Sequence, residues 1–193
     1  MPPLSPPPAT PPAIFLDRDG VIIENRTDYC RSWEEVVILP GALQALARAQ
    51  GTSYAVVIIT NQSAVGRGLL DRATADDINT RLVATIHAAG GRVDGLFICP
   101  HVPEAGCDCR KPKPGLLLQA ARELVLDLPQ SVLIGDALSD LVAARAAGVG
   151  QAMLVRTGRG IEQLALAQAA GAGDFPVYAN LSEALDAVLG QSA

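Results

Sequence analysis

The sequence is poor in aromatic and in charged residues. Aromatic side chains make up 4% of the 193 residues and charged side chains 18%, whereas hydrophobic residues reach 49%. Ala, Leu, Val and Ile must therefore fill most of the core. The chain also lacks any apolar run of about 18 residues, which excludes a transmembrane helix. Its length suits a single domain with a sizeable core.

An excess of basic charge is missing too. The chain has 15 Lys and Arg against 20 Asp and Glu, a formal net charge of -5. This balance argues against a basic nucleic-acid-binding surface. We expect a monomer that binds neither nucleic acid nor membranes. An anionic substrate stays possible, because a local cluster of Arg and Lys can dominate one site.

The N-terminal stretch MPPLSPPPATPP has neither the basic start nor the apolar centre of a secretory signal, so we expect a cytoplasmic protein. Its proline density is typical of a flexible, polyproline-like segment. The sequence therefore predicts a disordered tail over residues 1–12 and one domain over residues 13–193.

Short apolar runs alternate with longer amphipathic stretches along the chain. We expect strands at residues 13–17, 54–60, 95–99, 131–136 and 152–156, and helices at 40–51, 71–89, 114–126, 138–147 and 182–189, the last with Ser182 as N-cap. Neither face of the strands alternates to polar residues, as in buried parallel sheets. The sequence predicts an α/β fold, a doubly wound, Rossmann-like parallel sheet with helices on both faces.

Polar residues follow several of these strands, where ligands bind in such sheets. The motif FLDRDG places Asp17 and Asp19 two residues apart, so both carboxylates can point to the same side. One could attack a phosphate while the other transfers a proton. Taken alone, the pair is equally consistent with an ordinary Asp-rich turn.

Three further motifs fit phosphate chemistry. Thr60, in IITNQS, can hold phosphate oxygens together with the backbone N–H groups that follow it, and Lys111, in CRKPKPG, can supply a positive charge. Asp136 and Asp140, in IGDALSD, suit Mg²⁺. Each motif has a simpler alternative: a polar loop, a surface lysine, or acids favoured by a helix N-terminus.

Three of the four cysteines crowd into one short loop. The segment CPHVPEAGCDC brings Cys99, His101, Cys107 and Cys109 together, and these four side chains complete a tetrahedral Zn²⁺ shell. A structural zinc is therefore predicted in loop 99–109. The alternatives are reduced, unliganded thiols or a disulfide at Cys107. Cys30 stands apart, and we expect it to be a partly buried thiol.

In this order, the four motifs resemble the haloacid dehalogenase-like (HAD) phosphohydrolase superfamily, over about residues 13–156. The resemblance implies that Asp17 is the nucleophile and Asp19 the general acid/base, and Asp19 favours phosphate over carbon–halogen chemistry. Thr60 and Lys111 would stabilise the transferring phosphoryl group. Mg²⁺ would be held by Asp17, the backbone carbonyl of Asp19 and Asp136, with Asp140 in support.

The zinc loop is similar to a subgroup that includes the D-glycero-D-manno-heptose 1,7-bisphosphate 7-phosphatases and the histidinol-phosphatase domains. The segments NQSAVGRG, LVRTGRG and DYCRSWEEVVILPG favour the heptose enzymes, whereas the short spacing between His101 and Cys107 is typical of the histidinol-phosphatase relatives. The spacing of the motifs leaves no room for a large cap domain between them. The substrate would be a small phosphorylated sugar, contacted by Tyr29, Asn61, Gln62, Ser63, Arg67 and Arg110.

The leading hypothesis is a Mg²⁺-dependent phosphatase that removes the 7-phosphate of the heptose bisphosphate. Histidinol-phosphate phosphatase and a less specific phosphosugar phosphatase are the alternatives. A polynucleotide 3′-phosphatase is disfavoured by the acidic composition. A non-catalytic binding module is disfavoured because a pure binder needs no nucleophile and acid together.

Overall fold

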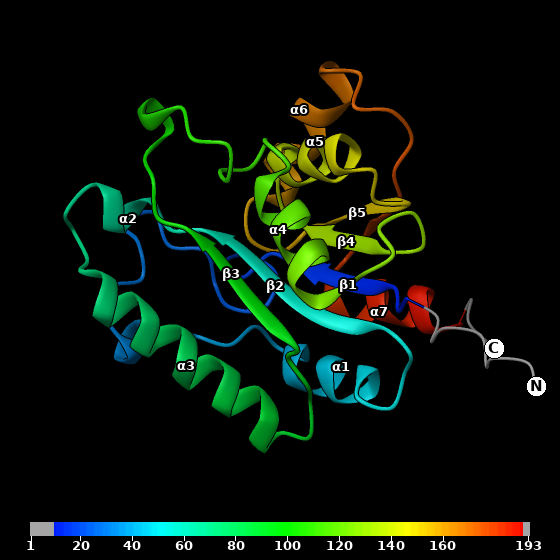
Figure 1. The fold of residues 1–193 in the computed structure, drawn as a ribbon, viewed down its shortest axis with the longest axis horizontal. Helices are drawn as coiled ribbons and strands as arrows, with labels where there is room; N and C mark the ends of the chain where they lie inside the picture. The colour runs from blue at the N-terminus through cyan, green and yellow to red at the C-terminus, as the bar shows by residue number, and fades with distance from the viewer. Residues whose placement is uncertain (1–9, 191–193) are drawn as a thin grey trace, which may run out of the picture.

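The computed structural model describes residues 10–190 and places a six-stranded parallel sheet at the centre of the molecule (Figure 1). The strand order is β3-β2-β1-β4-β5-β6. The strands are β1 (Ala13–Leu16), β2 (Ala55–Asn61), β3 (Gly95–Cys99), β4 (Val132–Gly135), β5 (Gln151–Val155) and β6 (Val177–Tyr178). The sequence-based prediction of a doubly wound parallel sheet is confirmed. β1 and β4 are buried along their whole length, which explains their continuous apolar sequences.

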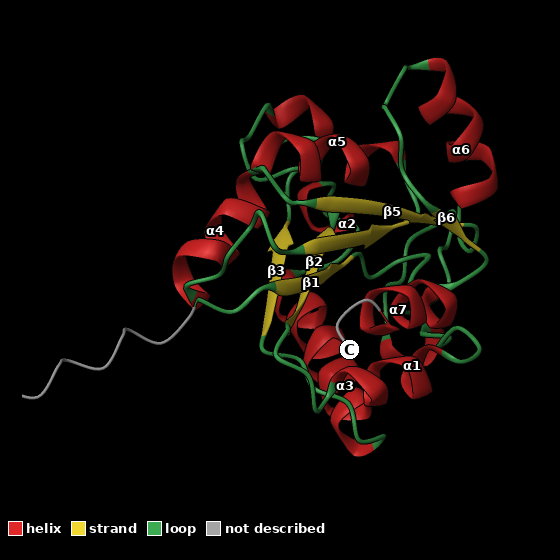
Figure 2. Cartoon of the chain, turned by 90° about the vertical axis from the view of Figure 1, so that its right-hand side faces the viewer, coloured by secondary structure: helices red, strands yellow, loops and turns green. Residues whose placement is uncertain are grey.

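Helices cover both faces of the sheet (Figure 2). One layer contains α1 (Ala42–Ala49), α3 (Arg72–Ala88) and α7 (Leu181–Gly190), and the other contains α4 (Gly115–Leu124), α5 (Leu138–Ala147) and α6 (Gly160–Ala169). The short helix α2 (Ser63–Gly66) follows β2, and single 3-10 turns lie at Trp33–Glu35 and Pro103–Ala105. Each layer has its own core, as shown by Leu46 and Leu185 against Ile14 on one face, and by Leu117 and Ala143 against Phe15 on the other.

Three elements of the structure were not predicted. Strand β6 has only two half-buried residues, α2 has only four residues, and α6 lacks a strong apolar stripe, so none of the three gave a clear pattern in the sequence. The predicted N-cap of the last helix was wrong. Ser182 lies inside α7, and the Asn180 side chain accepts the Glu183 N–H at 3.1 Å instead.

The described chain is attached to the sheet slightly before β1. The carbonyl of Pro11 accepts from the Asp127 N–H at 3.0 Å, and that of Pro12 accepts from the Ala55 N–H at 2.8 Å. These two prolines, expected in the tail, are therefore bonded to the domain. Residues 1–9 of the predicted tail lie outside the described residues.

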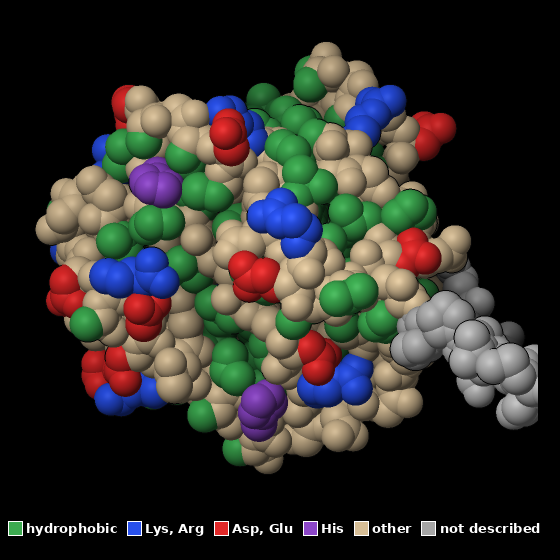
Figure 3. Space-filling view, viewed as in Figure 1, with side chains coloured by type: hydrophobic (Ala, Val, Ile, Leu, Met, Phe, Trp, Pro, Cys, Tyr) green, Lys and Arg blue, Asp and Glu red, His purple; other side chains and the backbone are tan. Residues whose placement is uncertain are grey.

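The surface carries charges of both signs. On the face shown in Figure 3, acidic and basic side chains are interspersed among scattered apolar ones. None of the helices between residues 10 and 190 has both the length and the apolar character needed to cross a membrane.

Candidate active site and thiol cluster

A cavity of about 1000 Å³ opens at the carboxyl ends of the central strands. Because β1, β2 and β4 are parallel neighbours, the residues that follow them meet at one edge of the sheet. The cavity is lined by residues from all four predicted motifs and from the loop after β1, among them Asp17, Asp19, Asn25, Arg26, Tyr29, Thr60, Gln62, Ser63, Arg110, Lys111, Ser139 and Arg159. The convergence that the strand-end positions predicted is therefore present.

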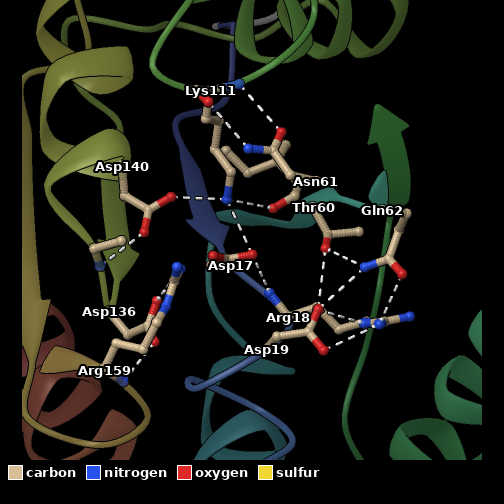
Figure 4. Close-up of polar contacts among 12 residues, drawn as sticks. Asp17, Arg18, Asp19, Thr60, Asn61, Gln62, Lys111, Asp136, Asp140 and Arg159 are labelled. Atoms are coloured by element: carbon tan, nitrogen blue, oxygen red, sulfur yellow. Dashed lines mark hydrogen bonds and ion pairs between the residues drawn. The ribbon is translucent and has the colours of Figure 1, made fainter. Parts of the chain in front are cut away.

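Lys111 lies between two buried carboxylates (Figure 4). Its Nζ is 2.7 Å from Asp140 Oδ1 and 3.0 Å from Asp17 Oδ1, and it donates to the carbonyl of Ile59 at 3.1 Å. Burial alone would lower the pKa of Lys111, but the charges of Asp140 and Asp17 raise it, so the ammonium stays charged. Asp140 also accepts the Ala137 N–H at 3.1 Å, so its carboxylate fixes the lysine and the start of α5.

The Asp17 carboxylate is crowded by negative charge. Burial raises the pKa of Asp17 to about 7; Lys111 opposes this shift, and Asp140 and Asp19 add to it. Burial and the neighbouring Asp17 also raise the pKa of Asp136. Lys111 therefore offsets only part of the effect of burial and negative charge on Asp17, and an added cation would favour the ionised forms of Asp17 and Asp136.

The carboxylate cluster, which we define as Asp17, Asp136 and Asp140, has the donor set of a magnesium site. Its oxygens lie within 4.8 Å of one another, and all three residues are buried. Two glycines make room for it: a Cβ on Gly20 would lie 2.2 Å from Asp136 Oδ2, and one on Gly158 would lie 2.4 Å from it. Hard carboxylate oxygens in a confined, negatively charged recess fit Mg²⁺.

The second carboxylate of the first motif lies on the other side of the cavity floor. Asp19 Oδ2 accepts from Thr60 Oγ1 at 3.3 Å and from Gln62 Nε2 at 3.1 Å, and Gln62 also donates to Thr60 at 2.8 Å. The Asp19 side chain keeps 23% of its surface exposed, so it remains accessible from the cavity. It is free of the Lys111 contact that engages Asp17.

Other predicted substrate contacts differ in where they lie. Asn61 and Lys111 exchange two hydrogen bonds through the Asn61 amide and the Lys111 backbone, at 3.0 and 3.1 Å. Asn61 therefore holds the Lys111 segment against β2, although it also borders the cavity. Ser63 begins α2 and is buried beside the cavity.

Three further predicted contacts come from loops. Tyr29 lines the cavity with a left-handed backbone, φ 65°, which is rare for an aromatic residue. Arg110 lines the cavity as well and donates to the carbonyl of His101 at 3.2 Å. Arg67 is exposed at the end of α2 and is not among the residues that line the cavity. The structure thus brings Tyr29 and Arg110 to the cavity but not Arg67.

The four predicted zinc ligands come together beside this cavity. The thiol cluster, which we define as Cys99, His101, Cys107 and Cys109, has Sγ–Sγ separations of 3.2 to 3.6 Å and His101 Nδ1 at 3.3 Å from Cys109 Sγ. These separations are far from the roughly 2.05 Å of a disulfide. They are close to the roughly 3.8 Å edge of a tetrahedron with Zn–S bonds near 2.3 Å. The donor set therefore fits zinc.

The thiols of this cluster differ in pKa. Burial, followed by the hydrogen bond with Cys109, raises the pKa of Cys99 to about 12. At Cys107, burial is outweighed by hydrogen bonds from Cys109 and the Arg110 N–H, which lower the pKa to about 7. Cys30 lies outside the cluster, as expected, and borders the main cavity; it is buried rather than partly buried.

The sequence analysis missed three side chains of the site. Arg18 contacts Asp19, Asn79 of α3 contacts Arg18, and Arg159 contacts Asp136 through its backbone N–H at 2.8 Å. Two signals were available: Arg18 stands between the two acids, and Arg159 lies in the segment LVRTGRG. Asn79 lies in a segment with no chemical motif of its own.

Comparisons with known proteins agree with this geometry. The HAD-hydrolase-like family model matches residues 108–184. The D-glycero-beta-D-manno-heptose-1,7-bisphosphate 7-phosphatase of Bordetella bronchiseptica is 42% identical over 178 residues, covering 92% of this chain and 96% of that protein. The enzyme of the same name from Pseudomonas aeruginosa is 40% identical over 151 residues, 78% of this chain and 84% of that one.

Solved structures give the same picture. The B. bronchiseptica D,D-heptose 1,7-bisphosphate phosphatase, complexed with magnesium and phosphate, has a TM-score of 0.85 and 39% identity, covering 94% of this chain and 99% of that chain. The corresponding Burkholderia thailandensis phosphatase has a TM-score of 0.68 and 34% identity, with coverages of 92% and 98%. Fold, site and relatives together show that the chain belongs to the D-glycero-β-D-manno-heptose-1,7-bisphosphate 7-phosphatase family of HAD-like hydrolases.

Proposed function

We propose that this protein is a Mg²⁺-dependent phosphatase that hydrolyses the 7-phosphate of D-glycero-β-D-manno-heptose 1,7-bisphosphate. The observation that carries the proposal is the arrangement of Asp17, Asp19 and Lys111 around one cavity, with Lys111 Nζ 3.0 Å from Asp17 Oδ1. A nucleophilic carboxylate, a second carboxylate for proton transfer and a cation are the parts that this reaction needs. Relatives with this name match most of the chain, up to 92% of it.

Asp17 is the proposed nucleophile. One of its oxygens attacks phosphorus, the bond from phosphorus to the sugar oxygen breaks, and an aspartyl-phosphate forms. Asp19 gives its proton to the leaving sugar oxygen. It then removes a proton from the water that hydrolyses the aspartyl-phosphate, so that each turnover restores both carboxyl groups. The exposed edge of Asp19 faces the cavity in which both transfers occur.

The negative charges of substrate and nucleophile repel each other. Lys111 offsets part of this repulsion, because its buried ammonium can reach the equatorial phosphate oxygens from its position beside Asp17. Asp17, the Asp19 carbonyl and Asp136 would hold Mg²⁺, with Asp140 in support through Lys111. When bound, Mg²⁺ supplies positive charge that neutralises the nucleophile and the phosphoryl oxygens. Thr60 lies at the edge of the same floor and would donate to the phosphoryl group.

The lining of the cavity supports a substrate with a second phosphate. Its basic side chains are Arg18, Arg26, Arg110, Lys111 and Arg159, and its acidic ones are Asp17, Asp19 and Glu162. Histidinol phosphate would instead need acidic groups for its ammonium and imidazole. We propose that Arg110 contacts the 1-phosphate, because it combines a position at the cavity wall with a planar, bidentate donor. The remote phosphate would then anchor the sugar while the 7-phosphate reacts.

We further propose that the thiol cluster binds one structural zinc ion. Four donors leave no position for a reacting water, which is typical of structural sites. The loop that carries them leads directly into Arg110 and Lys111, so the metal would fix the segment that presents these two side chains. A cytoplasmic, monomeric protein remains the prediction from the sequence.

A substrate panel tests the proposed function. Purified protein with Mg²⁺ is assayed for phosphate release from the heptose 1,7-bisphosphate, fructose 1,6-bisphosphate and histidinol phosphate, and the position of the remaining phosphate on the heptose is determined by NMR. We expect the highest kcat/KM for the heptose bisphosphate and retention of its 1-phosphate. A higher kcat/KM for histidinol phosphate would overturn the substrate assignment.

A further inference from the structure

The largest fully buried side chain of the described molecule is charged. Arg18, between the two acids of the first motif, keeps only 2% of its surface exposed. Its Nε lies 3.1 Å from Asp19 Oδ2 and its Nη2 lies 3.1 Å from Asp19 Oδ1, so the guanidinium binds both oxygens of one carboxylate. A two-point contact fixes the plane of the carboxylate and not merely its distance.

The guanidinium is itself held from two other elements. Nη1 donates to Asn79 Oδ1 of α3 at 2.8 Å, and Nη2 donates to Gln62 Oε1, after β2, at 3.0 Å. Figure 4 shows the Arg18 guanidinium and Gln62 next to each other beside the Asp19 carboxylate, away from the group formed by Lys111, Asp17 and Asp140. We call Arg18, Gln62 and Asn79 the Asp19 clamp.

The cost of burying a charge argues against a purely structural role for Arg18. Removing a guanidinium from water costs several kcal/mol, and the pairing with a carboxylate often no more than compensates for this cost. An apolar side chain in the same buried position would avoid that cost. The clamp does secure something that an apolar residue cannot: a defined orientation of a carboxylate that is partly exposed at a turn, just before Gly20 with its φ of 84°.

We propose that Arg18, held by Asn79 and Gln62, is a positioning residue that sets the orientation of Asp19 for proton transfer to the leaving group and from water. The inference rests on the proposed phosphatase function. Its consequence is selective: losing the clamp impairs the steps that need Asp19 and spares the attack by Asp17, whose partners are Lys111 and the Arg18 backbone N–H.

The test compares substrates that differ in their need for a proton. A sugar oxygen leaves only when it is protonated, whereas p-nitrophenolate leaves without a proton. For Arg18→Met we expect kcat/KM to fall about 100-fold on the heptose bisphosphate, or on whichever sugar phosphate of the panel is hydrolysed fastest, and by less than about threefold on p-nitrophenyl phosphate. On the aryl ester kcat falls together with KM, because hydrolysis of the aspartyl-phosphate also needs Asp19.

A double-mutant cycle identifies the residue through which Arg18 acts. In an Asp19→Asn background, Arg18→Met should cause at most about a twofold further loss. Asn79→Leu keeps Arg18 and similar volume, so it should show the same selectivity with about a tenfold loss on the sugar phosphate. Asn79→Leu therefore tests the positioning role of Arg18 even if Arg18→Met does not fold. Arg81→Met, an exposed arginine of α3 paired with Asp77, is the matched control and should behave as wild type.

Equal losses of kcat/KM on both substrates, or full additivity with Asp19→Asn, would overturn the role of Arg18. A wild-type protein that hydrolyses no phosphate ester with Mg²⁺ would instead overturn the proposed function, so the two failures are distinguishable.

Discussion

The carboxylate cluster and the thiol cluster are the two groups of potential metal ligands in the described chain, and they are built in opposite ways. All three residues of the carboxylate cluster are buried: Asp17 and Asp136 directly follow the central strands β1 and β4, and Asp140 lies in the first turn of α5. In the thiol cluster only Cys99 is buried, and His101 is exposed on a loop. The carboxylate cluster is therefore part of the buried centre of the domain, whereas the thiol cluster lies in a surface loop.

The bonds around the two clusters differ accordingly. Lys111 and the N–H groups of Ala137 and Arg159 bind the carboxylates, so their geometry exists through protein contacts alone. The thiols and the imidazole chiefly contact one another. This difference teaches that metal loading should matter to chemistry in the first cluster and to folding in the second.

The largest effect is expected from Asp17→Asn. The amide keeps the shape of the side chain but cannot attack phosphorus, so kcat should fall by about 10⁴-fold or more. The melting temperature should stay within a few degrees, because Lys111 retains Asp140 as a partner. Steady-state kinetics and thermal denaturation check both halves, and substantial turnover would refute the assignment of Asp17.

The second prediction concerns the thiol cluster. Replacing Cys107 by Ser, or stripping zinc, should lower the melting temperature by on the order of 10 °C, because metal-ligand energy here is folding energy. Metal analysis of protein purified without chelator should find one zinc per chain. Cys30→Ser, outside the cluster, is the matched control and should retain zinc. Protein without zinc at full stability would contradict the comparison.

The third prediction concerns Arg110, which stands in sequence between Cys109 of the thiol cluster and Lys111, the partner of Asp17 and Asp140. Arg110→Ala should lower kcat/KM for the heptose bisphosphate about 10- to 100-fold, the value of a charged hydrogen-bonded contact. A small monophosphate ester should lose less than about threefold by the same reasoning. Arg67→Ala tests the exposed arginine that the structure leaves outside the cavity. Equal losses on both substrates would argue against a contact with the second phosphate.

The smallest effect is a pH dependence of stability in magnesium-free buffer with zinc retained. The pKa of Asp17 is raised from 3.8 to about 7, so the folded state binds a proton more tightly than the unfolded state. Its contribution to stability is complete below about pH 4 and is lost as the pH rises through 7.

Thermal melts should therefore show a loss of about 5 °C between pH 5 and pH 8. Saturating Mg²⁺ should restore most of this loss, and Asp17→Asn should remove the dependence on pH. A melting temperature that rises over this range in the wild type, with no response to Mg²⁺, would show that the carboxylates are not the source.

Much of the site could be predicted from the sequence because its signals are local. Continuous apolar runs mark buried parallel strands, and a parallel sheet brings the ends of its central strands to one edge. Asp17, Thr60 and Asp136 were therefore expected to meet before their distances were known. The zinc ligands were predicted for the same reason, since four soft donors in one short loop need little help from the fold.

What only the tertiary structure decided is which distant elements supply the supporting contacts. Three of these contacts join segments far apart in the chain. Arg18 bonds to Asn79 of α3, Asn61 holds the Lys111 segment, and Gly158 lies close against Asp136. Sequence periodicity describes one element at a time, whereas hydrogen bonds between elements depend on how helices and strands pack. The reacting groups follow from local pattern, and their orientation follows from packing.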